Sequence, residues 1–344
     1  MRYEPGVLHL VDQRILPNTE TWLACNTLEK VAAAIEDMVV RGAPAIGCTA
    51  AFGILVDAIE FSREADSTWE SYEARFTKVC MRLSRTRPTA VNLFYAIDSF
   101  KELVKKIPKE TSFEEVVKKF EFLAVSLHDG DIATCKAIGD HGAGMQKEGK
   151  LRVLTHCNTG SLATAGYGTA LGVIRSLYKQ DKLEIVYVDE TRPYLQGARL
   201  TAFELEQEGI PYKLITDSVA AWLMQKSEVD WVVVGADRIA SNGDTANKIG
   251  TYSLAVNCNH HKIKFFVAAP LTTFDLQIKS GEEIPVEERS EDEVKNWGGR
   301  LIAPQNAEVY NPSFDVTPSD LITAIITEKG VISSPYLENI AAKF

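Results

Sequence analysis

The sequence predicts an α/β protein made of two domains. The first is mostly helical with a small β-hairpin, and the second is a Rossmann-like domain on a doubly wound parallel sheet. Two observations carry this prediction. Apolar residues recur at helical spacing up to about residue 145, whereas short apolar, β-rich runs alternate with helical patterns from residue 151 onward. A glycine-rich stretch lies between them, so we place the domains at residues 1–145 and 146–344.

The composition limits the classes of function. The chain has 344 residues, which is enough for two ordinary domains, and it is 45% hydrophobic and 24% charged, as expected of a soluble globular protein. Its formal net charge of -10 argues against nucleic acid or an anionic membrane as the main partner. We expect no signal peptide and no membrane-spanning stretch, and therefore a cytoplasmic protein.

The six cysteines are scattered and form no C-x-x-C pair, so neither a zinc motif nor a disulfide framework is expected. The first strand of the second half is not followed by G-x-G-x-x-G, and the chain contains no Walker-type loop and no H-E-x-x-H. A dinucleotide cofactor or a catalytic metal is therefore not predicted.

The N-terminal elements are predicted in order from their periodicity. A hairpin of short strands is expected around Asp12-Gln13, because apolar and polar residues alternate over the first 20 positions. The expected helices cover Thr27–Val40, Cys48–Ile59, Trp69–Leu83, Phe94–Ile107 and Phe113–Gly142.

Two arginines in this part stand next to predicted helix starts. Arg41 opens the glycine-rich segment Arg41–Gly47, where Gly42 and Ala43 precede Pro44, a residue suited to a first helical turn. Such a segment could hold a phosphate, or it could be a packed turn between helices. Arg87 precedes Pro88 and the next helix, so it could project toward an anion or simply be solvated.

The C-terminal part is predicted to alternate strands and helices. The expected strands are Leu151–Thr155, Glu184–Val188, Tyr212–Thr216, Trp231–Gly235, Lys264–Ala268 and a last one at Phe314–Pro318. The expected helices are Thr164–Tyr178, Gln196–Gln207, Ser218–Gln225 and a final helix Ser319–Lys329 capped by Gly330, with a loop at Leu271–Trp297.

Polar residues follow several of these strands. They are His156-Cys157, Asp189-Glu190, Asp217 and Asp237-Arg238. A single Asp after a strand is usually a helix N-cap, but ligands bind outside the carboxyl ends of parallel strands, so several acids together indicate a site.

Cys157 is the candidate reactive residue. It ends a strand that is expected to enter a helix through a tight turn, and the backbone N–H groups of such a helix favour an anion such as a thiolate. The alternative is a buried structural cysteine. Asp237, in a glycine-punctuated turn with Asn247 and Lys248, could be a general acid in a largely apolar pocket, or a turn-former or ion-pair partner of Arg238.

Taken together, four segments resemble the methylthioribose-1-phosphate isomerase family over essentially the whole chain. They are Arg41–Gly47, Thr155–Gly160, the Glu190-Thr-Arg-Pro run, and Gly235–Ile239 with Asn247-Lys248. The resemblance implies an aldose–ketose isomerase that converts 5-methylthioribose 1-phosphate to 5-methylthioribulose 1-phosphate in methionine salvage, a route of methionine biosynthesis. Each segment alone is weak, whereas the combination is specific.

The resemblance also assigns roles to residues. It implies that Cys157 and Asp237 are the catalytic pair, and that the substrate contacts come from Arg41, Gly42, Ala43, Arg87, Gln196, Asn247 and Lys248. It further implies a homodimer that needs no metal or organic cofactor. The cytoplasmic location is expected from the sequence itself, which leaves open whether the protein also enters the nucleus.

Three alternatives stay open from the sequence. Hydrogen could move from C2 of the sugar as a proton taken by Cys157 or as a direct hydride shift. The substrate could be ribose 1,5-bisphosphate, as in a related isomerase of the same superfamily. The chain could also be a non-catalytic regulatory subunit, like the alpha, beta and delta subunits of the guanine-nucleotide exchange factor for translation initiation.

Overall fold

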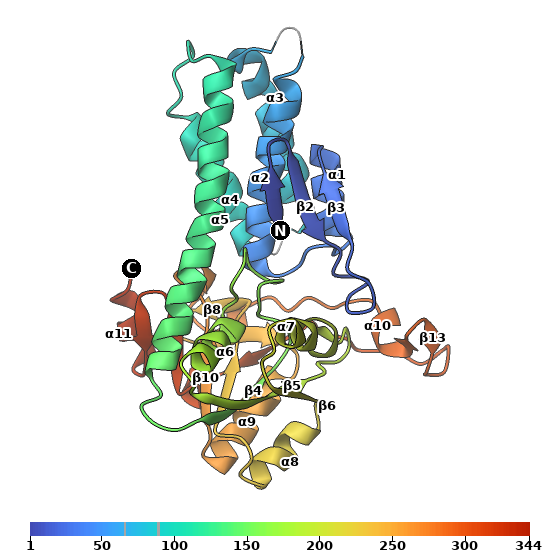
Figure 1. Ribbon diagram of the computed structural model, residues 1–344, viewed down its shortest axis with the longest axis vertical. Coiled ribbons are helices and arrows are strands. Elements are labelled where there is room, and N and C mark those ends of the chain that lie inside the picture. The colour runs from blue at the N-terminus through green and yellow to red at the C-terminus, as the bar shows by residue number, and fades with distance from the viewer. Residues whose placement is uncertain (65–66, 88–89) are drawn as a thin grey trace. The chain divides into compact units, whose positions relative to one another are not determined.

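The computed structural model describes residues 1–64, 67–87 and 90–344, so Pro88 lies outside the described residues. The chain forms two compact units: Met1–Ala133 with Ser161–Gly168, and Thr134–Gly160 with Thr169–Phe344 (Figure 1). The domain boundary after residue 145 stays a prediction, because compactness alone does not show which segments fold independently.

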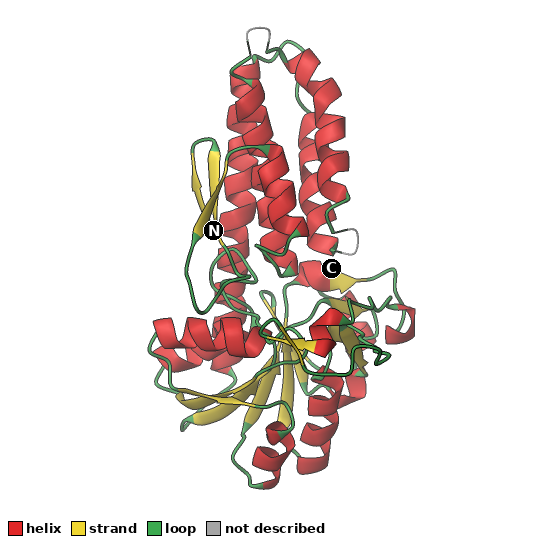
Figure 2. Ribbon diagram, turned by 90° about the vertical axis from the view of Figure 1, so that its right-hand side faces the viewer, coloured by secondary structure: helices red, strands yellow, loops and turns green. Residues whose placement is uncertain are grey.

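The first unit begins with a three-stranded antiparallel sheet, β1 (Arg2–Glu4), β2 (Val7–Val11) and β3 (Trp22–Cys25), which lies beside the helices of this unit (Figure 2). The tight turn of the hairpin is at Pro5-Gly6, where Gly6 has a φ of 82°. The hairpin expected around Asp12-Gln13 is confirmed in part, because β2 and β3 pair antiparallel on either side of it, with Val11 opposite Trp22. Residues 12–21 form a longer connection, however, and the two-residue turn lies at Pro5-Gly6, where Gly6 supplies the positive φ that such a turn needs.

The helices of this unit are α1 (Leu28–Glu36), α2 (Ala43–Phe61), α3 (Trp69–Ser84), α4 (Val91–Val104) and the first part of α5 (Phe113–Gly144), which continues into the second unit after Ala133. The Thr27 hydroxyl caps α1, accepting the Lys30 N–H, and α1 ends before the predicted Val40. α2 starts earlier than predicted, directly after Gly42, with Pro44 in its first turn.

α2 is long and apolar enough to cross a membrane, which corrects the expectation that the chain has no such stretch. Most of the helix is buried in the helical core, against α1, α3 and α4. Its one buried carboxylate, Asp57, lies 2.7 Å from the Arg75 guanidinium of α3. These contacts are those of the core helix of a globular unit.

The second unit is built on a seven-stranded sheet in the order β16-β15-β10-β7-β4-β5-β6. Every neighbouring pair is parallel except β15 with β16. The strands are β4 (Leu151–Thr155), β5 (Leu183–Asp189), β6 (Tyr212–Ile215), β7 (Trp231–Val234), β10 (Lys264–Ala268), β15 (Ala324–Thr327) and β16 (Gly330–Ile332).

Helices cover both faces of this sheet. Alternate strand residues enter different cores, so Val233 packs with the C-terminal part of α5 and with α6 (Ala170–Lys179) and α7 (Ala202–Gln207). Val234 packs instead with α8 (Val219–Gln225), α9 (Thr251–His261) and α11 (Tyr336–Ala341). The predicted α/β class, with a helical N-terminal part and a doubly wound parallel sheet, is confirmed.

The final helix predicted at Ser319–Lys329 is wrong. Only a single 3₁₀ turn, Ser319–Leu321, forms there, and the chain continues as β15 and β16. The segment Ala324–Thr327 is buried throughout and pairs in parallel with β10, which satisfies its backbone and suits its β-branched residues.

Smaller elements complete the unit. A second sheet has the order β11-β8-β9-β14, and β12 pairs with β13. Their bounds are β8 (Arg238–Ala240), β9 (Thr245–Lys248), β11 (Phe274–Asp275), β12 (Asn296–Trp297), β13 (Arg300–Leu301), β14 (Phe314–Thr317) and α10 (Asp292–Lys295), with a π-helical turn at Gly197–Thr201 and 3₁₀ turns at Leu271–Thr273 and Gly281–Glu283.

Candidate active site

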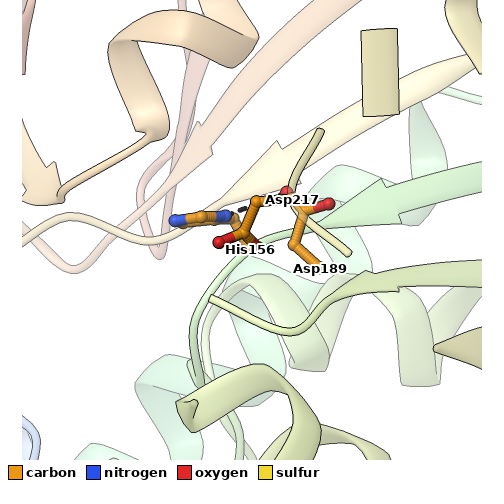
Figure 3. Close-up of side chains that lie close together, drawn as sticks. All are labelled: His156, Asp189 and Asp217. Atoms are coloured by element: carbon orange, nitrogen blue, oxygen red, sulfur yellow. Dashed lines mark hydrogen bonds and ion pairs between the residues drawn. The ribbon is translucent and has the colours of Figure 1, made fainter. Parts of the chain in front are cut away.

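Three polar side chains meet where three adjacent strands of the large sheet end. His156 follows β4, Asp189 ends β5 and Asp217 follows β6, and their nitrogen and carboxylate oxygen atoms lie within 4.8 Å of one another (Figure 3). The acids and the histidine that follow separate strands in the sequence are thus brought together at one edge of the sheet, as the parallel order of β4, β5 and β6 requires.

His156 is held from both sides of its ring. Nδ1 lies 2.9 Å from Asp189 Oδ2, and Nε2 lies 2.9 Å from the carbonyl oxygen of Ile249. Because a carbonyl only accepts, Nε2 carries a hydrogen, and one further proton is shared between Nδ1 and the carboxyl group. Gly250 has a φ of 105°, and a Cβ there would lie 2.9 Å from the imidazole Cε1, so the ring packs directly on this glycine.

Burial and the hydrogen bond between them shift the pKa values of both His156 and Asp189. Burial raises the pKa of Asp189 to about 6, and the neighbouring His156 opposes this rise. Burial lowers the pKa of His156, but the hydrogen bond and charge of Asp189 outweigh it, so that the pKa lies above its usual value. Both shifts therefore favour the protonated form of the pair.

The same cluster has the residue types of a metal site, but most of its donor atoms are engaged, and among the described residues only Asp189 Oδ1 in this cluster has no hydrogen-bond partner. Both ring nitrogens of His156 are hydrogen-bonded, and the two oxygens of Asp217 accept the backbone N–H groups of Thr191 and Arg192 at 2.7 and 2.8 Å. An ion at this position would have to displace the His156–Asp189 hydrogen bond. We therefore treat the cluster as a hydrogen-bonded support for the adjacent Cys157.

Cys157 is half-buried, whereas the other five cysteines are buried, which favours the reactive interpretation over the structural one. Its φ is 62°, in the left-handed region. Its N–H donates to the Thr191 hydroxyl at 2.7 Å, and its carbonyl accepts from the Thr201 hydroxyl at 2.6 Å.

One expectation about this loop is wrong. The helix predicted to start at Thr164 begins at Ala170, so the residues after Cys157 form a loop and not a tight turn into a helix. The small and glycine-rich run that suggested a helix, Ser161–Gly168, belongs to the first compact unit instead. A helix N-terminus immediately after Cys157 is therefore not available to stabilise a thiolate.

Asp237 lies in the bend between β7 and β8, and its backbone N–H donates to the Ala246 carbonyl at 2.9 Å. The residue is exposed, so the apolar surroundings predicted for its carboxyl are not observed among the described residues. Its neighbour Arg238 forms an ion pair with Asp275 at 3.3 Å.

Three further predicted site residues are buried in the second unit. Gln196 immediately precedes the π-helical turn and is 1% exposed. Asn247 and Lys248 belong to strand β9, where a turn was expected. The Asn247 amide donates to Thr251 Oγ1 at 3.0 Å, and the Lys248 ammonium donates to the Ser313 carbonyl at 2.9 Å and lies 4.5 Å from the centre of the Phe314 ring.

The other four predicted residues belong to the first unit. Arg41 is half-buried, and Gly42 is the N-cap of α2 with a φ of 94°. Ala43 is the first residue of α2, whose Ala45 N–H donates to the Ala163 carbonyl. Arg87 is half-buried in the connection between α3 and α4.

Sequence reasoning missed Thr191 and Thr201. Thr191 stands in the Glu190-Thr-Arg-Pro run and Thr201 lies inside the helix predicted at Gln196–Gln207, so neither carries a signal of its own in the sequence. Their positions also separate them from Cys157 by 34 and 44 residues, and only the folded sheet brings them together.

Comparison with known proteins gives consistent results over the whole chain. Residues 39–334 match the family model described as the initiation factor 2 subunit family. A curated relative from Fervidobacterium nodosum, named methylthioribose-1-phosphate isomerase, is 51% identical over 344 residues, which is all of this chain and 97% of the relative.

Solved structures agree with this. The chain is similar to the crystal structure of 5-methylthioribose 1-phosphate isomerase from Pyrococcus horikoshii, with a TM-score of 0.93 and 44% identity over 99% of this chain and 94% of that one. It is also similar to the translation initiation factor eIF-2B, subunit delta, from A. fulgidus, with a TM-score of 0.88 and 42% identity over 99% of this chain and 100% of that one.

Proposed function

The chain belongs to the initiation factor 2 subunit family and to the methylthioribose-1-phosphate isomerases, and we propose that Cys157 and Asp237 carry out its reaction. It is an isomerase of methionine salvage, converting 5-methylthioribose 1-phosphate to 5-methylthioribulose 1-phosphate. The single observation that carries this function is the full-length identity of about one half to relatives of that name.

Ring opening is the first chemical difficulty. The phosphate on C1 prevents the simple opening that a free aldose undergoes, so an acid has to protonate the ring oxygen while the C1–O bond breaks. We assign this proton to the Asp237 carboxyl. Because Asp237 is exposed, the bound sugar itself would have to exclude water from the carboxyl during this step.

Hydrogen then moves from C2 to C1 by one of two balanced routes. In the first, the Cys157 thiolate removes the C2 proton, the electron pair forms a C1=C2 enol, and the thiol returns the proton to C1. In the second, hydride moves directly from C2 to C1 and Cys157 stabilises the charge or positions the sugar. In both routes the C2 hydroxyl loses its proton to the Asp237 carboxylate, which restores the acid for the next turnover.

An isotope experiment separates the two routes. With deuterium at C2 of the substrate, a hydride shift delivers the label to C1 of the ketose, as seen by NMR of the product. Transfer through Cys157 gives partial or complete replacement of the label by solvent hydrogen, because a thiol exchanges its proton with water.

The remaining predicted contacts orient the substrate. We propose that Arg41, Gly42, Ala43 and Arg87 bind the phosphoryl group through guanidinium and backbone donors. Gln196, Asn247 and Lys248 would bind the sugar hydroxyls or the phosphate. Lys248 and Asn247 already have partners in the fold, so they would have to exchange or share these hydrogen bonds on binding.

A second candidate function follows from the similarity to the eIF-2B delta subunit, a regulatory role without catalysis. A substrate panel distinguishes the candidates. The purified chain is expected to form ketose from 5-methylthioribose 1-phosphate and not from ribose 1,5-bisphosphate. Activity with ribose 1,5-bisphosphate alone would make that sugar the substrate. A folded chain that is inactive on both sugars would favour the regulatory role.

Two properties of the whole protein stay proposals. The bacterial relatives suggest a cytoplasmic enzyme, and they give no support to the nuclear alternative. The homodimer implied by the family resemblance is tested by light scattering of the purified chain, which should give twice the mass of 38.0 kDa.

A further inference from the structure

The backbone of Cys157 and the backbone of its partner Thr191 are both left-handed. Their φ angles are 62° and 61°, a region that disfavours residues with a Cβ and is a marked outlier for a β-branched residue such as Thr. Such conformations persist only where surrounding contacts enforce them, and they gather at functional sites. The contacts that enforce the Cys157 conformation can be named.

Thr191 holds the amide side of Cys157. Its hydroxyl accepts the Cys157 N–H at 2.7 Å and donates to the Asp189 carbonyl at 3.1 Å, so both hydrogen-bonding roles of the hydroxyl are used. The Thr191 side chain is fully buried. Its own N–H donates to Asp217 at 2.7 Å, which ties the loop after β5 to the end of β6.

Thr201 holds the carbonyl side. Its hydroxyl donates to the Cys157 carbonyl at 2.6 Å and accepts from the Asn158 amide at 3.2 Å. Asn158 also donates to Glu204 at 2.8 Å, and Glu204 pairs with the buried Arg175 at the same distance. Thr201 is 1% exposed, so its hydroxyl has no competing water.

We propose that Thr191 and Thr201 are positioning residues that hold the Cys157 peptide from both sides and thereby fix where its thiol meets the substrate. Both side chains are buried, at 0% and 1% exposure, so their role is assigned through Cys157 and not through a contact of their own with the substrate. The effect on turnover rests on the proposed function of Cys157, whereas the effect on the thiol itself does not. A misplacement of the reacting group by an ångström is enough to reduce turnover strongly without weakening substrate binding.

The test uses paired variants of the full chain. Thr191→Val and Thr201→Val keep the shape and lose the hydroxyl, and Thr191→Ser and Thr201→Ser keep the hydroxyl. The matched control is Thr327→Val, because Thr327 is also fully buried and its hydroxyl likewise donates to a carbonyl, that of Gly330, and accepts an N–H, that of Lys329. kcat, KM, the melting temperature and the rate of Cys157 alkylation by iodoacetamide are measured for each.

Each Val variant is expected to lose about tenfold or more in kcat with KM changed by less than about threefold. The alkylation rate of Cys157, located by peptide mass, is expected to change by about threefold or more, since the other five cysteines are buried. The Ser variants should stay within about twofold of the wild type in both rates, and Thr327→Val should lose stability alone.

The proposal is overturned if either Val variant keeps both rates within about twofold of the wild type, or if Ser is as damaging as Val. If Thr191→Val does not fold, Thr191→Gly takes its place under the same thresholds, because glycine accepts the left-handed φ and also lacks the hydroxyl. If the wild type shows no isomerisation, the proposed function has failed, and the alkylation rates alone decide whether these threonines position Cys157.

Discussion

The imidazole of His156 and the carboxyl group of Asp189 share one proton in the interior of the parallel-sheet unit, with Nδ1 and Oδ2 2.9 Å apart and both side chains 1% exposed. The second ring nitrogen donates to Ile249, so the ring has no freedom to turn. This pair lies beside Cys157 in the chain and, through Asp189 and Thr191, supports the loop that holds it. Its protonation is therefore coupled to the stability of the site.

The first prediction concerns the pH dependence of stability. The pKa of His156 is raised above its usual value of 6.5. The contribution of His156 to the free energy of unfolding is therefore fully present below pH 6.5 and is lost as the pH rises through the folded-state pKa. The pKa of Asp189 is raised from 3.8 to about 6, so its contribution to the free energy of unfolding is lost as the pH rises between these two values. Above about pH 6 this contribution no longer changes. Asp217, Asp315 and Glu190 are the other charged groups that act on the pair.

Asp189→Asn is expected to lower the free energy of unfolding by about 3 kcal/mol at pH 6.5, because it leaves a buried imidazolium without its partner. At pH 9 the loss should be smaller, since the Asn amide can donate to a neutral imidazole. The measurement is the difference in melting temperature between wild type and variant across this range.

The control for this experiment is Asp230→Asn, which removes the partner of Arg152 at 2.8 Å. Burial tends to raise the pKa of Asp230, but the Arg152 hydrogen bond outweighs it and the pKa is lowered, so its contribution is constant above pH 6.5. If the stability loss caused by Asp189→Asn were also the same from pH 6.5 to pH 9, as expected for Asp230→Asn, His156 would not carry the shared proton.

A second prediction concerns the glycine under the His156 ring. Gly250→Ala should cost about 1 kcal/mol for its positive φ and about 1 kcal/mol more for the contact with the imidazole. Gly149→Ala is the matched control, because Gly149 has a φ of 78° and open space around its Cβ position. Thermal melts of the two variants measure the difference in stability. Equal losses of stability would mean that the His156 ring moves aside at no cost.

A third prediction concerns the phosphate. Arg87→Ala should raise KM about tenfold and leave kcat within about threefold, as expected when a charge-assisted contact to a non-reacting group is lost. Arg85→Ala, an exposed neighbour at the end of α3, should leave both constants unchanged. An unchanged KM for Arg87→Ala would remove Arg87 from the substrate site.

The extent to which the sequence predicts this molecule differs between elements. Strand β4 was predicted with the same bounds, because short apolar runs bounded by polar turns have one interpretation in an alternating pattern. The residues of β15 lie inside a predicted helix, because a continuous apolar segment shows neither the period of a helix nor that of a strand. Its partner β10, more than 50 residues earlier, decides its conformation.

The site divides in the same way. The choice of Cys157 as the candidate residue and the cluster of strand-end acids follow from residue type and position, which a sequence displays, whereas the half-burial of Cys157 does not. The left-handed backbone of Cys157 depends on loop dihedral angles, and the threonine hydroxyls that enforce it come from residues far along the chain. A sequence displays neither the dihedral angles nor these contacts. The exposure of Asp237 likewise depends on what covers the bend after β7.

The most direct test of the account is the rate of ketose formation from 5-methylthioribose 1-phosphate by the wild type, Cys157→Ser and Asp237→Asn. Both variants are expected to lose about a hundredfold or more in kcat with unchanged melting temperatures, as for residues that move protons in the transition state. Cys258→Ser and Asp181→Asn, at a buried and an exposed position outside the site, should keep the wild-type rate. A folded Cys157→Ser or Asp237→Asn variant with near-normal kcat would contradict the assignment of that residue.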